Sequence, residues 1–140
     1  MTGLDKVRRD DARTSRRQGG EIRILLSSIT TGSTAGFLGT VDLAPGDYVS
    51  GHYHPYSDEF MYVVRGALLV ETGEQRLKLG ADEALMMPRE TPHRFTNKGD
   101  EPAFVVFHIG PLAPSPELGH VETEPVPLPD DSPPSVGGNR

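Results

Sequence analysis

Short runs of apolar residues, separated by turn-forming residues, occupy the middle of the chain. Within several runs apolar and polar positions alternate, which is the period of a strand with one buried face. The intervening turns are rich in Gly, Pro, Asn and Asp, which favour tight backbone bends. No run keeps the 3.6-residue period of an amphipathic helix. The pattern predicts strands at residues 21–28, 36–43, 59–66, 67–72, 75–80, 84–88, 93–97 and 103–110.

Many short strands at near-regular spacing are typical of a β-sandwich or a β-barrel, because a sheet that folds onto itself hides its edges. The sequence therefore predicts an all-β fold. A chain of 140 residues with 35% hydrophobic content is suited to one domain with one core. No internal repeat suggests a solenoid or a duplicated domain.

The two ends of the chain lack such runs. Residues 1–20 are dense in Arg and Asp and predict an extended N-terminal arm, which either stays solvated or wraps a second subunit. The segment 21–28 is more apolar than one solvated face requires, so we expect it to pair with a second copy in a homodimer. Residues 123–140 are rich in Pro, Gly and Ser and predict a flexible tail. The predicted domain spans residues 21–122.

Charge and composition narrow the classes of partner. The net charge of −6 argues against a nucleic-acid partner, since phosphate binding needs a surplus of Lys and Arg. No cysteine is present, so neither disulfides nor thiolate metal ligands are available. The start of the chain has no signal-peptide core, and no stretch approaches the ~20 apolar residues that cross a bilayer. We expect a soluble cytoplasmic protein with no membrane partner.

The stretch HYHPYSDE, residues 52–59, concentrates groups with ligand chemistry. Strand alternation places His52 and His54 on one face. If the chain folds back as a hairpin after PYSD, Glu59 faces the same interior. Antiparallel pairing of strand 93–97 with strand 103–110, with Asn97 opposite Phe104 and Phe95 opposite Val106, would set His93 opposite His108. His120 lies in the Pro-rich exit, where a mobile segment makes a poor ligand, and is interpreted as a non-ligand.

A metal ion would satisfy several converging imidazoles at once, because each buried polar group needs a partner. Two histidines with a carboxylate are typical of non-haem Fe²⁺ sites. Nitrogen-rich sites without thiolates favour zinc or another divalent Lewis acid. We expect a divalent metal, Zn²⁺ first, with Fe²⁺, Ni²⁺ or Mn²⁺ as alternatives.

The spacing of these residues resembles the two motifs of the cupin superfamily. The first motif is matched without a gap by Gly46, His52, His54, Glu59 and Gly66. The second is matched by Gly80, Pro88, His93 and Asn97. It departs from the family pattern at Glu90, where the family usually has Gly. The resemblance implies a single cupin jelly-roll domain.

Longer strings resemble the monocupin cyclases of bacterial aromatic polyketide pathways, of the tetracenomycin and resistomycin type. They are GGEIRILLS, GHYHPYSDEFMYVVRG, MPRETPHRF and VVFHIGPLAPSPELGHV. The resemblance implies a small dimer with a divalent metal, zinc, at the bottom of an apolar cavity. It also implies aldol-type cyclisation of a poly-β-ketone, either free or tethered to an acyl carrier protein. It favours His52, His54, His93 and His108 as ligands and leaves Glu59 as a further contact or as the catalytic acid/base.

Inward-facing apolar residues would then mould the substrate, although each could instead be simple core packing. The predicted set is Phe37, Val41, Met61, Val63, Phe95, Phe104 and Val106. Two other functions stay open. One is an Fe²⁺ dioxygenase that acts on a flavonol-like or diketone substrate with the same histidines. The other is a noncatalytic small-molecule-binding cupin, although sensor cupins normally accompany a DNA-binding segment that this sequence lacks.

Overall fold

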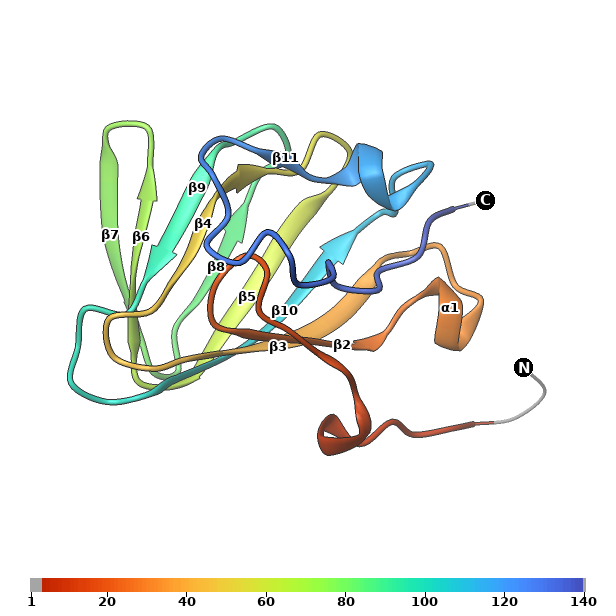
Figure 1. Ribbon diagram of the computed structural model, residues 1–140, viewed down its shortest axis with the longest axis horizontal. Coiled ribbons are helices and arrows are strands. Elements are labelled where there is room, and N and C mark those ends of the chain that lie inside the picture. The colour runs from red at the N-terminus through yellow and green to blue at the C-terminus, as the bar shows by residue number, and fades with distance from the viewer. Residues whose placement is uncertain (1–3, 140) are drawn as a thin grey trace.

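Two antiparallel β-sheets, packed face to face, make up the computed structural model, which describes residues 4–139 (Figure 1). The larger sheet has the strand order β1 (Thr14–Ser15), β2 (Glu21–Leu26), β3 (Phe37–Leu43), β10 (Ala103–Gly110), β5 (Asp58–Arg65) and β8 (Ala84–Met87). The smaller sheet has the order β11 (Val121–Glu122), β4 (Tyr48–Tyr53), β9 (His93–Thr96), β6 (Ala67–Thr72) and β7 (Gln75–Gly80). The predicted all-β fold is confirmed.

Helical structure within residues 4–139 is limited to α1 (Ser28–Thr31) and two 3₁₀ turns, Arg9–Asp11 and Pro116–Gly119. The predicted strand 21–28 ends early because the Ser27 side chain caps α1, accepting a 3.2 Å hydrogen bond from the Ile29 amide. The other predicted strands agree with the structure to within one residue at each end. None of the helices in the described range is long and apolar enough to cross a membrane.

The core lies between the sheets and follows strand alternation. In β10, Val105, Phe107 and Ile109 are buried, and the intervening side chains lie on the outer face of the larger sheet. Phe95 and Val70 meet them from the smaller sheet. The inner face is therefore apolar, so a polar group placed on it must find its partners inside the sandwich.

The predicted pairing of strand 93–97 with strand 103–110 is wrong. β9 pairs with β4 and β6, whereas β10 pairs with β3 and β5 in the opposite sheet. The connection crosses between sheets, and Asn97 anchors it by donating from Nδ2 to the carbonyls of Leu43 (2.9 Å) and Glu101 (2.8 Å). β4 and β5 likewise lie in different sheets, so the predicted hairpin after His54 does not form.

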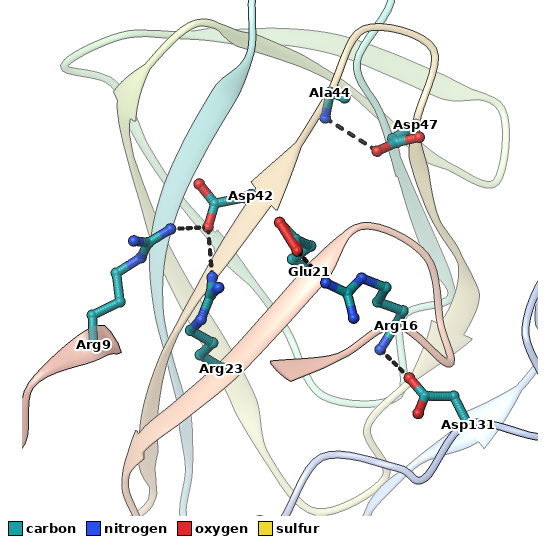
Figure 2. Close-up of polar contacts among 8 residues, drawn as sticks. All are labelled: Arg9, Arg16, Glu21, Arg23, Asp42, Ala44, Asp47 and Asp131. Atoms are coloured by element: carbon teal, nitrogen blue, oxygen red, sulfur yellow. Dashed lines mark hydrogen bonds and ion pairs between the residues drawn. The ribbon is translucent and has the colours of Figure 1, made fainter. Parts of the chain in front are cut away.

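Segments near both ends of the described range contact the sandwich. In the N-terminal arm, β1 pairs with β2, and Arg9 joins Arg23 on the carboxylate of Asp42 (Figure 2). The C-terminal tail passes from β11 back along the arm toward α1 (Figure 1). The Leu128 amide donates to the carbonyl of Arg17 at 3.2 Å. The division of the chain at residues 20 and 122, and the flexibility of the tail, stay predictions.

Candidate metal centre and ligand cavity

Four buried side chains from both sheets converge inside the sandwich. His52 lies in β4 and His54 directly follows it, His93 opens β9, and Glu59 lies in β5 of the facing sheet. Each of the four residues is at most 6% exposed. One potential ligand atom from each lies within 4.8 Å of the others. The structure thus brings together four of the five residues that the sequence predicted for the metal or the chemistry.

Backbone carbonyls fix the orientation of the three imidazoles. Nδ1 of His52 lies 2.7 Å from the Ser50 carbonyl, and Nδ1 of His93 lies 2.8 Å from that of Thr91. Nδ1 of His54 lies 3.0 Å from the carbonyl of Gly119. A carbonyl oxygen only accepts, so each Nδ1 carries hydrogen and each neutral imidazole presents a lone pair at Nε2.

Two of these lone pairs, those of His54 and His93, face another acceptor, the carboxylate of Glu59. Its Oε1 lies 3.4 Å from Nε2 of His54 and 3.3 Å from Nε2 of His93. All three atoms are buried and have no hydrogen-bond partner among the described residues. Ligands held about 2.1 Å from one divalent ion are themselves about 3.0–3.4 Å apart. The donor set and its spacing therefore fit such an ion.

The pKa shifts within the cluster follow from burial and from the charges of neighbouring members. Burial raises the pKa of Glu59, but the adjacent imidazoles of His54 and His93 outweigh it and lower the pKa overall. Burial lowers the pKa of His54, and the Glu59 carboxylate reverses that shift. The pKa of His52 is lowered by burial and then by the charges of the neighbouring histidines. A proton or a metal ion between Oε1 of Glu59 and the Nε2 atoms of His54 and His93 would remove the repulsion between these facing acceptors.

A cavity of about 440 Å³ is lined by three residues of this cluster. These three are His52, His54 and Glu59, and His120 lies among the other polar lining residues. The rest of the wall is largely apolar and comes from both sheets and the loop after β10, through Ile22, Ile24, Phe37, Val41, Val49, Phe95, Phe107, Ile109 and Leu112. A largely apolar cavity with a few convergent polar groups is the usual form of a small-molecule site.

The predicted substrate-binding residues fall into three groups. Phe37, Val41 and Phe95 line the cavity. Met61 and Val63 are buried in the core without lining it. Phe104 and Val106 lie on the outer face of β10, so their predicted contact with a ligand in this cavity is wrong. That prediction depended on the incorrect pairing of β9 with β10. The wrong pairing turned Phe104 and Val106 inward, whereas the buried face of β10 carries Val105, Phe107 and Ile109.

His108 shares that outer face and is not brought to the cluster. It lies opposite Leu38 of β3 and Phe60 of β5. Its ring closely approaches Gly36, where an added Cβ would lie 2.5 Å from Nε2. The predicted convergence of His93 with His108 is therefore wrong, and Glu59 stands where a fourth ligand was expected.

His120 is a cavity residue that sequence reasoning missed. β11 pairs with β4, placing Val121 opposite Tyr53, and this pairing holds the preceding His120 against the site. Its ring stacks on that of His52 with centroids 4.6 Å apart. Its Nε2 lies 3.3 Å from Nε2 of Gln18, and burial lowers its pKa to about 4. The strand that positions His120, β11, has only two residues, Val121 and Glu122. A run this short shows no alternation in the sequence, so it could not be predicted as a strand.

The sandwich and its buried His–His–Glu–His group are features of a cupin. Residues 39–109 match the cupin domain family, and the chain belongs to that family.

Relatives and a solved structure refine the comparison. The tetracenomycin polyketide synthase protein TcmJ of Streptomyces glaucescens is 50% identical over 133 residues, covering 95% of this chain and 89% of TcmJ. Polyketide synthase CurC of Streptomyces cyaneus is 50% identical over 117 residues, covering 84% and 76%. The structure of the polyketide cyclase RemF from Streptomyces resistomycificus superposes with a TM-score of 0.70 over 91% of this chain and 90% of RemF. Its sequence identity is 18%, so that likeness concerns the fold alone. The predicted resemblance to cupins of polyketide pathways is confirmed.

Proposed function

We propose that this protein is a metal-dependent cyclase of aromatic polyketide biosynthesis, which closes a ring of a poly-β-ketone by aldol condensation and loss of water. The observation that carries the proposal is the set of facing acceptors in a largely apolar cavity: the Nε2 atoms of His54 and His93 and Oε1 of Glu59. The polyketide synthase names of the relatives at 50% identity support the substrate class.

In this proposal His52, His54, Glu59 and His93 hold one divalent cation, Zn²⁺ first. When bound there, the cation supplies a Lewis acid that polarises a ketone oxygen and stabilises negative charge on it. The carbonyls of Ser50, Gly119 and Thr91 keep the three imidazoles in the tautomer that ligation requires. This anchoring means that the protein orders the ligands before the cation binds.

The apolar wall has the second task. A poly-β-ketone is flexible, and only one of its folded forms brings the correct methylene to the correct carbonyl. Phe37, Phe95 and Phe107 line the cavity, and the rings of Phe37 and Phe107 lie edge to face with centroids 6.2 Å apart, so these rings would restrict the folded forms that the chain can adopt. In this proposal the apolar wall determines which ring closes, and the cation held by the His52–His54–Glu59–His93 group polarises the ketone.

Glu59 has two roles to be distinguished. As a ligand it stays between His54 and His93, where its lowered pKa keeps it ionised at neutral pH. As the catalytic acid/base predicted from the sequence, it would take the methylene proton. The proximity of Oε1 to two histidine nitrogens supports the ligand role.

The direct test compares His93→Ala with His108→Ala, because His108 is a histidine outside the cluster. A poly-β-ketone is supplied in situ by a minimal polyketide synthase, and the products are separated by chromatography and mass. We expect His93→Ala to lose both bound metal and the cyclised product, and His108→Ala to keep both. Cyclisation by a His93→Ala protein free of metal would overturn the proposal.

The same preparation separates the dioxygenase alternative. Three histidines and a carboxylate also suit Fe²⁺. Elemental analysis of protein purified without chelators, combined with an oxygen electrode, decides between them. Bound iron with oxygen uptake would replace the cyclase proposal, whereas zinc without uptake supports it.

We also propose a homodimer and a substrate that is either free or tethered to an acyl carrier protein. The edge of β2 supports association: among the described residues β1 pairs with β2 only at Ile22 and Arg23, so residues 24–26 have no β1 partner on that edge. Light scattering that gives the mass of one chain would contradict the dimer.

A further inference from the structure

The C-terminal tail, residues 127–139, contributes to the wall of the cavity although it follows the last strand of the sandwich. Pro133, Pro134, Val136 and Gly137 all line the cavity. Pro134, Val136 and Gly137 are half-buried. The arm contributes Arg17 and Gln18 to the same cavity. One part of the wall is therefore built from the two ends of the chain.

Contacts from the arm hold the tail in place. Arg13 donates to the carbonyl of Pro133 and, at 3.2 Å, to the hydroxyl of Ser135. The hydroxyl of Ser15 donates to the carbonyl of Ser132 at 2.6 Å. Each of these bonds joins positions more than 100 residues apart in the sequence. The arm therefore acts as a latch on the tail.

Arg16 connects this latch to the larger sheet. Its backbone amide donates to Asp131 at 2.6 Å, and its guanidinium donates to Glu21 of β2 at 2.7 Å (Figure 2). Figure 2 shows the two contacts extending to opposite sides of the residue. The tail is thus tied to the strand that also supplies Ile22 and Ile24 to the cavity wall.

The last residues of the tail fit closely against α1. Gly137 has φ +70°, and a Cβ at this position would lie 2.1 Å from the Ser28 hydroxyl. The Asn139 amide then donates to the carbonyl of Ala113 at 3.1 Å. Glycine is needed here both for the left-handed backbone and for the close approach.

We propose that the C-terminal tail is a ligand-binding wall, which covers the substrate of the metal centre and is latched by the arm. Pro133 and Pro134 have restricted backbones, so ordering this wall costs little conformational entropy. Its half-buried apolar residues would bury ligand surface on the side that the sheets leave uncovered. The inference rests on the proposed function only for the chemical class of the ligand.

The test uses the metal-loaded full chain and the probe 2-acetyl-6-methoxynaphthalene, an aromatic ketone whose emission changes in apolar surroundings. The double variant Arg13→Ala/Gly137→Ala loosens the latch and the end of the tail. Its matched control is Arg76→Ala/Gly73→Ala. Arg76 forms an exposed ion pair, and Gly73 has φ +55° with nothing within 4 Å of an added Cβ.

We expect the Kd for the probe to rise at least tenfold in the tail variant, which corresponds to about 1.4 kcal/mol. The control should stay within twofold of the wild type, and all three proteins should keep the same metal content. A chain that ends at Pro127 should lose at least as much affinity. The inference is overturned if both tail variants bind like the wild type, or if the wild type does not bind the probe.

Cyclisation assays on the same proteins separate this inference from the proposed function. If the wild type forms no ring but the tail variants lose the probe, the cyclase proposal fails and the wall stands. If the wild type cyclises and the tail variants match it in both assays, the wall fails and the cyclase proposal stands.

Discussion

Oε1 of Glu59 lies 3.3 Å from Nε2 of His93, while Nδ1 of the same imidazole faces the Thr91 carbonyl at 2.8 Å. The carbonyl requires hydrogen on Nδ1, so two acceptors face each other across the remaining gap. Two buried acceptors at this distance repel unless a cation or a proton lies between them. This relationship makes Glu59 the residue whose substitution is most informative.

Glu59→Gln replaces the carboxylate with an amide of nearly the same shape. The amide removes a negative charge from the ligand set. Loss of a hydrogen-bond partner behind a metal ligand already lowers metal affinity about 10- to 100-fold, so we expect zinc affinity to fall by at least 10-fold when a ligand itself is changed. Competition with a chromophoric chelator measures this affinity. A variant that binds zinc like the wild type but turns over at least 100-fold more slowly would instead identify Glu59 as the acid/base.

His120→Phe should preserve the metal centre. The phenyl ring can keep the stacking on His52, and His120 does not belong to the group of ligand atoms. We expect unchanged metal content and a higher KM, because a polar group that lines the cavity is lost. Elemental analysis with steady-state kinetics checks both values. Loss of the metal would show that His120 completes the ligand set.

Acid should destabilise the metal-free protein partly through His120. The folded protein keeps this histidine neutral down to about pH 4, whereas the unfolded chain protonates it below a pKa of about 6.5. The unfolded state thus binds more protons between these values, and the free energy of unfolding falls as the pH falls through this window.

The two neighbouring histidines, His52 and His54, have opposite effects on the free energy of unfolding in this pH window. The lowered pKa of His52 acts in the same direction, and the raised pKa of His54 acts in the opposite one. We therefore compare the wild type with His120→Gln by urea unfolding at pH 7 and pH 5. The variant should lose less stability than the wild type on acidification. An equal loss in both proteins contradicts this assignment.

Asn97→Ala should cost about 2–4 kcal/mol of unfolding free energy, since it leaves buried carbonyls without donors. Asn97 is 1% exposed and donates to Leu43 and Glu101, while its Oδ1 accepts from the Gly99 amide. Urea unfolding measures the loss. Asn97→Asp keeps only the acceptor and should be similarly destabilised. If the free energy of unfolding changes by less than about 0.5 kcal/mol in either variant, the hydrogen bonds of Asn97 do not stabilise the crossover between the sheets.

Alternation and turn chemistry predicted most strands, because these signals are local. β6, β7 and β10 have their predicted bounds. Strand partners were not predictable in the same way, since the alternation of β9 is compatible with any neighbour. Placing β10 beside β9 therefore misassigned His108, Phe104 and Val106.

The site was partly predictable for a similar reason. His52 and His54 share a face through alternation within one segment, and the motif spacing added Glu59 and His93. His120 depends on the pairing of a two-residue strand, β11, with β4, and the wall at Pro133–Gly137 depends on contacts with an arm more than 100 residues away. Neither feature leaves a periodic signal in the sequence.

The central claim is that a divalent cation in the His52–His54–Glu59–His93 group is required for ring closure. The most direct measurement is the rate of cyclisation by the wild-type protein after removal of metal and after addition of one equivalent of Zn²⁺. We predict that the metal-free protein forms no more cyclised product than a reaction without protein, and that zinc restores the rate. Equal rates before and after the addition of zinc would contradict the claim.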